Sequence, residues 1–583
     1  MIDRPIEKIK AGATRPGLAL TERFLAPFVT AVMFGYLGLF LIYPVWIMLN
    51  GAFSGVDGFS LQYFSILLSS PLIREACINS FLIALAATVV AFLLALPMAH
   101  IMTRYLFPGK SLVSALLLLP MVMPPFVGAI GLQQILSKYG VLNSFLMKVG
   151  ILGYDQPIHW LGMGGVAGIV ILQALHLYPI LYLNLSASMS TLDPSLREAA
   201  QNMGASSRKI LRTITLPLII PGLFGGSFIV FIGSLTDLGT PLMFNFTRCI
   251  PVQIFDGISD MNTNPIGFTL VIFTLLVTAL LFIAARALFM NKSYEVVSRS
   301  GHTGSFEIQA SQRQKACFYS FFALIIFLAA IPNIMVVLQS FAGPWFMSAL
   351  PERWTLENYS FLASHPLSVS SIRNSLYYSS VSGIIDVIFG VGIAWVITRS
   401  KARYGWLLDT LAMLPLALPG LVLAFGYMAA FDLDIPWLNP RVNPVLLLIV
   451  SYSVRRLPYM VRAACAGFQQ ASITLQEAST GLGASPIRTL RKITLPLILG
   501  HLIGGFILTF CFAVLEVSDS LILATREPFY PITKLMWDLI SRIEPQAASY
   551  TCALGVLGML ILIISLWIAS KCMGKKLGQI FRI

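Results

Sequence analysis

Long apolar runs recur along the whole chain, and they limit its fold more than any other feature. Each run has about 20 residues with almost no charge, which is the length that an α-helix needs to cross a bilayer. Only 11% of the residues are charged and 57% are hydrophobic, a balance too apolar for a soluble globular protein. Backbone exposed to lipid must satisfy its own hydrogen bonds, and the runs are too long and uniform for barrel strands. The predicted fold class is therefore an all-α polytopic membrane protein.

About twelve spans are predicted, six in each half of the chain. The predicted spans are residues 25–50, 78–101, 111–135, 165–187, 216–236, 266–290, 317–340, 374–398, 406–430, 444–466, 498–523 and 550–570. The first is too long for a signal-peptide core, so it is predicted to be retained. The predicted organisation is an N-terminal segment (1–24), a first repeat (25–290), a flexible linker without a fold of its own (291–316), a second repeat (317–570) and a tail (571–583).

The distribution of Lys and Arg predicts the orientation. A net charge of +14 could indicate a nucleic-acid partner, but the positive residues lie in short loops beside hydrophobic segments, so no nucleic-acid partner is expected. With a cytoplasmic N-terminus, inside segments hold about 25 Lys and Arg and outside loops about 10. This asymmetry predicts that both termini and the linker are cytoplasmic.

A polar, basic loop occurs twice between these apolar runs. The second copy follows the first by 279 positions without a gap (477 − 198 = 279). The matching elements are Glu198-Ala199-Ala200 with Glu477-Ala478-Ser479, Gly204 with Gly483, and Ile214 to Pro217 with Ile493 to Pro496. Each copy lies between the fourth and fifth predicted spans of its half, which places both loops in the cytoplasm.

The duplication extends into the spans. Asn79-Ser80 pairs with Asn374-Ser375 at an offset of 295, whereas Pro179 pairs with Pro458 at an offset of 279. The first half thus carries 16 additional residues between its third and fourth spans (295 − 279 = 16). Because each half has an even number of spans, the halves are predicted to share one orientation, related by an axis along the membrane normal with the pathway between them.

Local signals predict the shape of each repeated loop. Asp193-Pro194 and Ser472 are helix N-caps, and Gly204 and Gly483 are placed to end short helices in a left-handed conformation. A second helix should follow each glycine. The small residues of the first helix would allow another surface to approach closely, and its glutamate would anchor that surface. An ordinary basic loop is the alternative, which duplication at equivalent places disfavours.

The two loops resemble the EAA signature of permease subunits of binding-protein-dependent ABC importers. The surrounding spans resemble two fused copies of that permease, and the fused form with Arg455-Arg456-Leu457-Pro458-Tyr459 is most similar to the iron(III) and 2-aminoethylphosphonate branch. The resemblance implies a location in a bacterial inner membrane, two cytoplasmic ATPase subunits that carry ATP and Mg²⁺, and an extracytoplasmic solute-binding protein. It also implies docking on those subunits by Glu198, Ala199, Ala200 and Gly204, and by Glu477, Ala478, Ser479 and Gly483. The expected substrate is iron(III), with 2-aminoethylphosphonate, a sugar phosphate or a polyamine as alternatives.

Several polar residues fall inside predicted spans. A charged side chain facing lipid would cost several kcal/mol, so these residues should face the protein interior or a watery cavity. The candidate pathway residues are His176, Tyr178, Asp237, Arg455, Arg456, Glu516 and Asp519. The alternative is an internal salt bridge in which Glu516 and Asp519 neutralise the arginines. Pro179 and Pro458 are expected to interrupt their helices at this depth, and the prolines of the third and ninth spans are either gating kinks or tolerated breaks.

The motifs of covalent chemistry are missing from the sequence. It contains no GxxxxGK[ST] phosphate loop, so ATP hydrolysis is assigned to a partner, and no HExxH, GxSxG or Cys/His metal cluster. The seven cysteines form no CxxC pair and are interpreted as small buried hydrophobes, so no metal site, catalytic residue or cofactor of this chain is expected. An ion-driven secondary transporter of two six-span halves and a membrane enzyme are rival hypotheses. The first gives the duplicated loop no role, and the second lacks catalytic residues.

Overall fold

The described part of the chain is predominantly helical. The computed structural model describes residues 16–55, 58–122, 125–190, 192–261, 264–289, 308–400 and 404–573. In this described part, eight helices are long and apolar enough to cross a membrane, or ten if each of two sharply bent helix pairs counts as one span. The predicted all-α polytopic fold is confirmed.

All twelve predicted spans correspond to helices. Seven segments are helices of the length expected for a span: α1–α2 (Pro16–Leu37 and Tyr43–Phe53, joined by a π-helical turn), α4 (Pro71–Arg104), α9 (Val166–Ser190), α12 (Leu216–Leu235), α16 (Gln312–Ser340), α18 (Pro366–Thr398) and α24 (Leu495–Val514). The eighth is α27 (Ala547–Met573). Two further predicted spans correspond to α15 (Ile266–Phe289) and α21 (Val445–Gln470). α15 is apolar, but the stretch of it that can be counted, Ile266–Leu281, is shorter than the eight long helices, whereas three arginines interrupt α21.

The third span of each half is broken. In the second half, the segment Gly405–Leu416 meets α20 (Gly420–Ala430) at 103°. In the first half, α5 (Lys110–Leu117) and α6 (Leu119–Val122) meet α7 (Pro125–Leu136) at 91°. Prolines at these positions remove backbone donors and favour extended backbone before them. The proline-rich turns are therefore true breaks in both halves.

Two details of the expected helices are wrong. α9 and α21 continue through Pro179 and Pro458, because the hydrogen bonds on either side of a single missing N–H hold the helix. The eleventh span does not extend to residue 523: α24 ends at Val514, and a separate short helix α25 (Ser518–Leu523) follows. The same break separates α12 from α13 (Gly239–Met243) in the first half.

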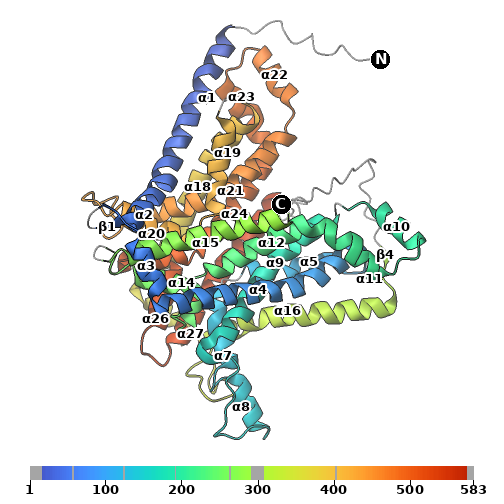
Figure 1. The fold of residues 1–583 in the computed structure, drawn as a ribbon, viewed down its shortest axis with the longest axis vertical. Helices are drawn as coiled ribbons and strands as arrows, with labels where there is room; N and C mark the ends of the chain where they lie inside the picture. Colours follow the sequence, from blue (N-terminus) through green and yellow to red (C-terminus); the bar gives the residue numbers. More distant parts are fainter. Residues whose placement is uncertain are drawn as a thin grey trace.

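The first span of each half packs against helices of the other half. In Figure 1, α1 (dark blue) lies beside α18 and α19 (Gly405–Met413) of the second half. The helix α16 (yellow-green) packs mainly on α7 of the first half, with smaller contacts to α5, α6 and α9. A Cβ at Gly131 of α7 would lie 2.0 Å from the carbonyl oxygen of Pro332, and one at Gly426 of α20 would lie 2.9 Å from Met48. These two glycines are equivalent in the duplication, and each lets the first span of the other half pack closely, so the exchange is reciprocal.

The end of the predicted linker has structure. Residues 290–307 lie outside the described residues, but the strand β4 (Ile308–Gln309) pairs in parallel with β3 (Tyr105–Leu106). The Ala310 N–H also donates to the Leu106 carbonyl at 3.1 Å. The chain is thus attached to the first half before α16 begins, which helps to direct α16 along that half.

Candidate functional sites

The first repeated loop has the predicted helix–glycine–helix form. Its first helix, α10 (Pro194–Asn202), starts where Asp193 Oδ1 accepts a hydrogen bond from the Ser195 N–H at 2.9 Å. This bond lowers the pKa of the Asp193 carboxyl. Gly204 has φ +79°, a left-handed conformation that favours glycine, and α11 (Ser207–Ile210) follows.

The second loop repeats this geometry. Its first helix, α22 (Ile473–Gly481), starts where the Ser472 hydroxyl accepts a hydrogen bond from the Thr474 N–H at 3.3 Å. Gly483 has φ +86°, and α23 (Pro486–Thr489) follows. Figure 1 shows α10–α11 and α22–α23 at the ends of two different helical arms. The local prediction is confirmed in both copies.

Both loops expose matching side chains. Glu198 and Glu477 are exposed, as are Ala199 and Ala478. Large apolar side chains at equivalent positions are exposed to similar degrees: Leu196 45% and Leu475 48%, then Met203 82% and Leu482 90%. Apolar side chains exposed at the same two positions of both copies mark a surface that a partner can cover.

The third residue of each signature is less exposed than the two residues before it. Ala200 is buried, as is Ile210 ten residues later. At the equivalent positions of the second loop, the Ser479 hydroxyl is 2.9 Å from the Thr489 hydroxyl. In the second loop, this contact joins α22 to α23. The second copy replaces an apolar pair with a hydrogen-bonded one, which accounts for its departure from the signature at Ser479.

Both intramembrane arginines are paired with carboxylates inside the second half. Arg455 Nη1 is 2.5 Å from Glu516 Oε1 and 3.2 Å from Asp519 Oδ2. Arg456 pairs with the other oxygen of Glu516 and donates to the Phe512 carbonyl at 3.0 Å. Four of the predicted pathway residues therefore form one ion network that joins α21 to the break between α24 and α25.

The two arginines have different surroundings. Arg456 has 8% of its side chain exposed and binds the C-terminal end of α24, whereas Arg455 has 21% exposed. The Arg455 guanidinium lies over Gly420, where a Cβ would be 2.2 Å from Arg455 Cζ. Arg455 therefore contacts the first residue of α20, directly after the bend of the broken span.

Sequence reasoning missed a fifth charged residue near this network. Asp386 of α18 is fully buried and accepts a hydrogen bond from the Ser453 hydroxyl at 2.6 Å; among the described residues, its Oδ2 has no hydrogen-bond partner. The Tyr36 hydroxyl donates to Ser453 at 2.8 Å, so α1 contributes to this cluster from the other half. A lone carboxylate in an otherwise apolar predicted span was the signal that could have identified it.

The equivalent place in the first half is less charged. Asp237 matches Glu516, but it accepts hydrogen bonds from the Gln173 amide at 3.1 Å and from the backbone N–H groups of Gly239 and Thr240 at 3.2 and 3.3 Å. His176 matches Arg455, and its Nδ1 lies 2.9 Å from the Pro120 carbonyl, at the broken third span. Tyr178 is fully buried and donates to the Leu117 carbonyl at 2.8 Å.

The two breaks meet between the halves. A Cβ at Gly239 would lie 3.0 Å from Val517 Cγ1 and 3.2 Å from Phe126. Val517 directly follows Glu516, and Gly239 lies two residues after Asp237. The equivalent carboxylates thus flank the contact between repeats, which is where a pathway on the pseudo-two-fold axis would run.

The duplicated Asn-Ser pairs also have equivalent contacts. The Ser80 hydroxyl accepts a hydrogen bond from the Ile250 N–H at 2.8 Å, and the Ser375 hydroxyl accepts one from the Ile532 N–H at 2.8 Å. The Asn79 and Asn374 amides bond carbonyls of the same two loops at 3.0 and 2.9 Å. In both halves, the Asn-Ser pair thus forms hydrogen bonds with the segment that follows the broken fifth span.

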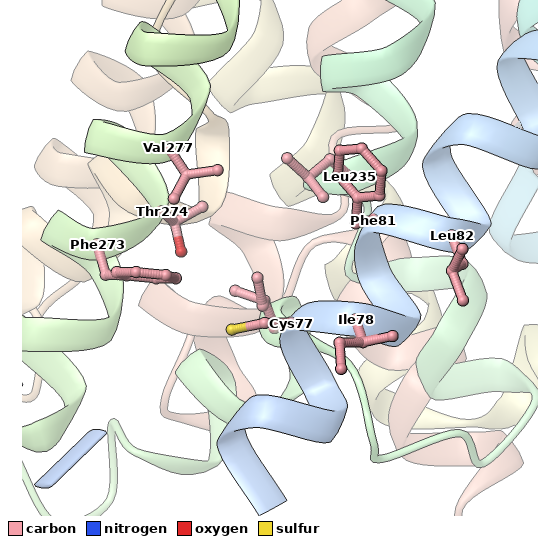
Figure 2. A pocket seen from close by; sticks show the side chains of 9 residues that line it. Cys77, Ile78, Phe81, Leu82, Leu235, Phe273, Thr274 and Val277 are labelled. Atoms are coloured by element: carbon pink, nitrogen blue, oxygen red, sulfur yellow. The ribbon is translucent and has the colours of Figure 1, made fainter. Parts of the chain in front are cut away.

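A cavity of about 290 Å³ lies apart from these polar groups. Figure 2 shows it between α4, which contributes Cys77 and Phe81, and α15, which contributes Phe273 and Thr274. Its lining is almost wholly apolar, so it offers no group suited to holding an ion.

Comparisons with known proteins agree with the duplication. The family described as "Binding-protein-dependent transport system inner membrane component" matches residues 87–290 and 386–577. The chain is 29% identical over 501 residues to the ferric transport system permease protein FbpB of Actinobacillus pleuropneumoniae, covering 84% of this chain and 70% of that protein. It is 28% identical over 507 residues to the putative ferric transport system permease protein FbpB 1 of Haemophilus influenzae, covering 84% and 76%.

Among solved structures, the chain is similar to a bacterial ABC transporter that imports alginate. The TM-score is 0.39 at 18% identity, and the match covers 48% of this chain and 98% of that one. Two family matches together span more than half of the chain, in line with the two helical repeats. The chain therefore belongs to the binding-protein-dependent transport system inner membrane components, as a multi-pass permease with both repeats in one polypeptide.

Proposed function

We propose that this permease carries iron(III) across the inner membrane as the translocation subunit of an ATP-driven importer. The ferric transport permeases to which it is similar over 84% of its length favour iron(III) over 2-aminoethylphosphonate, a sugar phosphate or a polyamine. A solute-binding protein delivers the substrate from outside. ATP and Mg²⁺ bind to partner subunits, because the sequence contains no phosphate-binding loop of its own.

The observation that carries this function is the pair of exposed, equivalent loops. Each presents a glutamate and a large apolar side chain on a short helix, and a second large apolar side chain directly after it, before the left-handed glycine. An apolar contact flanked by a charge is suited to docking in a groove on another protein. One chain thus binds two ATPase subunits, one through α10 and one through α22.

The sidedness follows from charge. The two loops, the linker and both termini are cytoplasmic, where Lys and Arg are most frequent. ATP-driven movement of the loops rocks the repeats against each other about the contact between Gly239 and Val517, which opens the pathway to one side at a time.

The intramembrane polar residues have different roles in that pathway: some meet the substrate and others hold the helices in place. Arg455 is the more exposed arginine and contacts the broken span, so it meets the substrate as the repeats separate. Arg456 and Glu516 hold α21 to the end of α24. His176 and Asp237 occupy the matching positions beside the axis in the first half, while Asp519 and Tyr178 orient their neighbours.

The docking role is tested by the Glu198→Ala/Glu477→Ala double variant, purified together with the ATPase. We expect the permease to insert normally and to lose the ATPase subunit. The control is Asp434→Ala, which removes an exposed carboxylate from the connection between α20 and α21, at the opposite end of α21 from the second loop. Intact copurification and normal transport by the double variant would disprove docking through these glutamates.

Radioactive iron(III) uptake in proteoliposomes tests the substrate. With the cognate binding protein outside and ATP inside, uptake should persist after ionophores dissipate ion gradients, which an ion-driven secondary transporter would not allow. Competition by excess 2-aminoethylphosphonate, sugar phosphate or polyamine should have no effect. ATP-driven uptake of one of these compounds, without iron(III) uptake, would reassign the substrate.

A further inference from the structure

The additional residues of the first repeat form a separate structure. The connection between α7 and α9 comprises residues 137–165, whereas α20 and α21 are joined by residues 431–444. The longer connection contains α8 (Val141–Lys148), which projects from the helical body in Figure 1. We call residues 137–160 the α8 arm.

A buried asparagine holds the α8 arm in shape. The Asn143 side chain is fully buried, and its amide nitrogen donates to the carbonyls of Lys138 at 3.0 Å and Ile158 at 2.8 Å. Its oxygen accepts a hydrogen bond from the Trp160 indole at 2.8 Å. A surface whose loops are ordered before binding loses less entropy when a partner docks.

The α8 arm and a loop of the second repeat enclose a pocket of about 430 Å³. The loop comprises residues 343–350 and is fastened where the Gln134 amide of α7 donates to the Trp345 carbonyl at 3.4 Å. The rings of Tyr139 and Phe346 lie 5.6 Å apart across the junction. Met347 has φ +51°. Residues other than glycine rarely adopt this backbone conformation, and those that do are often found at binding sites.

The pocket is positively charged and has aromatic walls. Lys138 and Lys148 line it with Tyr139 and Tyr154, and no ion pair of the described residues involves either lysine. Lys138 Nζ lies 5.5 Å from the centre of the Tyr139 ring. Two exposed ammonium groups beside one pocket are complementary to a carboxylate.

Exposed apolar side chains surround the pocket. They are Phe145, Val149, Ile151, Tyr154, Phe346 and Leu350, each more than half exposed. A positive pocket inside an apolar and aromatic rim has the composition of a protein interface. It differs from the repeated loops, whose anchor is acidic.

The α8 arm lies on the side of the membrane from which a binding protein arrives. α9 crosses the bilayer between the α8 arm and the first repeated loop, so these two surfaces lie on opposite sides. We propose that the α8 arm and residues 343–350 are the docking site of the solute-binding protein, which inserts a carboxylate side chain between Lys138 and Lys148. This proposal rests on the importer function and adds the surface and its charge. Only one repeat carries the arm, so it fixes which lobe of the binding protein meets which half.

Charge reversal tests the docking site in the assembled complex. Lys138→Glu/Lys148→Glu permease, with its ATPase subunits in nanodiscs, would be titrated with the iron(III)-loaded cognate binding protein at low and high salt. Both lysines are exposed, so the variant should assemble and keep its basal ATPase activity. The matched control is Arg373→Glu/Arg526→Glu, which makes the same charge change at exposed positions of the second repeat on the same side.

We expect Kd for the binding protein to rise about tenfold or more in the lysine variant, mostly at low salt, and much less in the control. Carbodiimide, which joins amines to carboxylates, should cross-link Lys138 or Lys148 of the wild-type complex to an Asp or Glu of the binding protein. An unchanged Kd, or an equal rise in the control, would overturn the proposal, as would an arm that contacts only bilayer lipid. If wild-type permease transports iron(III) while the lysine variant binds normally, the importer function stands and the docking site alone fails.

Discussion

The two repeats preserve their backbone contacts far better than their buried charges. At equivalent positions, the second repeat has Arg455 and Glu516 in an ion network, whereas the first has His176 and Asp237 held by neutral hydrogen bonds. The Asn-Ser contacts, the left-handed glycines and the exchanged first spans are the same in both. Duplication has thus conserved what shapes the helices, while the polar interior facing the axis has diverged. A pathway between two such halves would present more charged side chains from the second repeat than from the first, which suits an asymmetric or charged substrate.

The largest expected effect concerns the more exposed arginine. Arg455→Gln/Asp519→Asn removes one charge of each sign, so the interior keeps its balance and Arg456 keeps Glu516. Iron(III) uptake should fall at least about tenfold while the complex still assembles, because the variant lacks the group that we propose meets the substrate. His176→Gln at the matching position should reduce uptake much less. Equal effects in the two repeats would show that the asymmetry has no role in transport.

Arg456 should be more important for stability than for transport. Arg456→Leu places the first repeat's residue, Leu177, at the matching position and removes a buried partner of Glu516. We expect a loss of about 3–5 kcal/mol, seen as a lower midpoint of thermal unfolding in detergent. Arg462→Leu is the control on the same helix, since Arg462 is 52% exposed in its pair with Asp409 and should contribute about 1 kcal/mol or less. A normal melting midpoint for Arg456→Leu would show that the buried pair does not hold the helices.

The Asn-Ser contacts should behave alike in both halves. Ser80→Ala and Ser375→Ala each leave one buried backbone N–H, that of Ile250 or Ile532, without its acceptor. Each variant should lose about 1–3 kcal/mol of stability, measured by the same unfolding assay. A loss confined to one repeat would mean that only that repeat needs the contact.

The smallest expected effect is in the second repeated loop. Ser479→Ala/Thr489→Ile converts its hydrogen-bonded pair to the apolar pair of the first loop, Ala200 and Ile210. Because both partners change together, stability and ATPase binding should change by less than about 1 kcal/mol. Ser479→Ala alone leaves the Thr489 hydroxyl without this partner and should be the more destabilising variant. A large loss of ATPase binding in the double variant would mean that these positions contact the ATPase directly.

Some features could be predicted from the sequence because they depend on residues close together in the chain. Helix length and polarity gave the spans, and capping residues and glycines gave the shape of both repeated loops. Glu516 and Asp519 could be identified as candidate counter-charges, beside the alternative that they line a pathway, because lone charges are costly in a bilayer; both pair with Arg455. Pro179 misled the prediction, because one missing N–H costs less in a packed helix than in isolation.

The sequence by itself determined that this chain is a duplicated bundle of membrane helices with two capped loops, since each of these features depends on local composition and spacing. Only the tertiary structure decided that α1 and α16 pack on the opposite repeats, that Asp386 joins Ser453 and Tyr36, and that the α8 arm closes a pocket against residues 343–350. These contacts join segments that are distant in sequence. They depend on which glycines let backbones approach and which buried charges find partners, and no local pattern encodes that pairing.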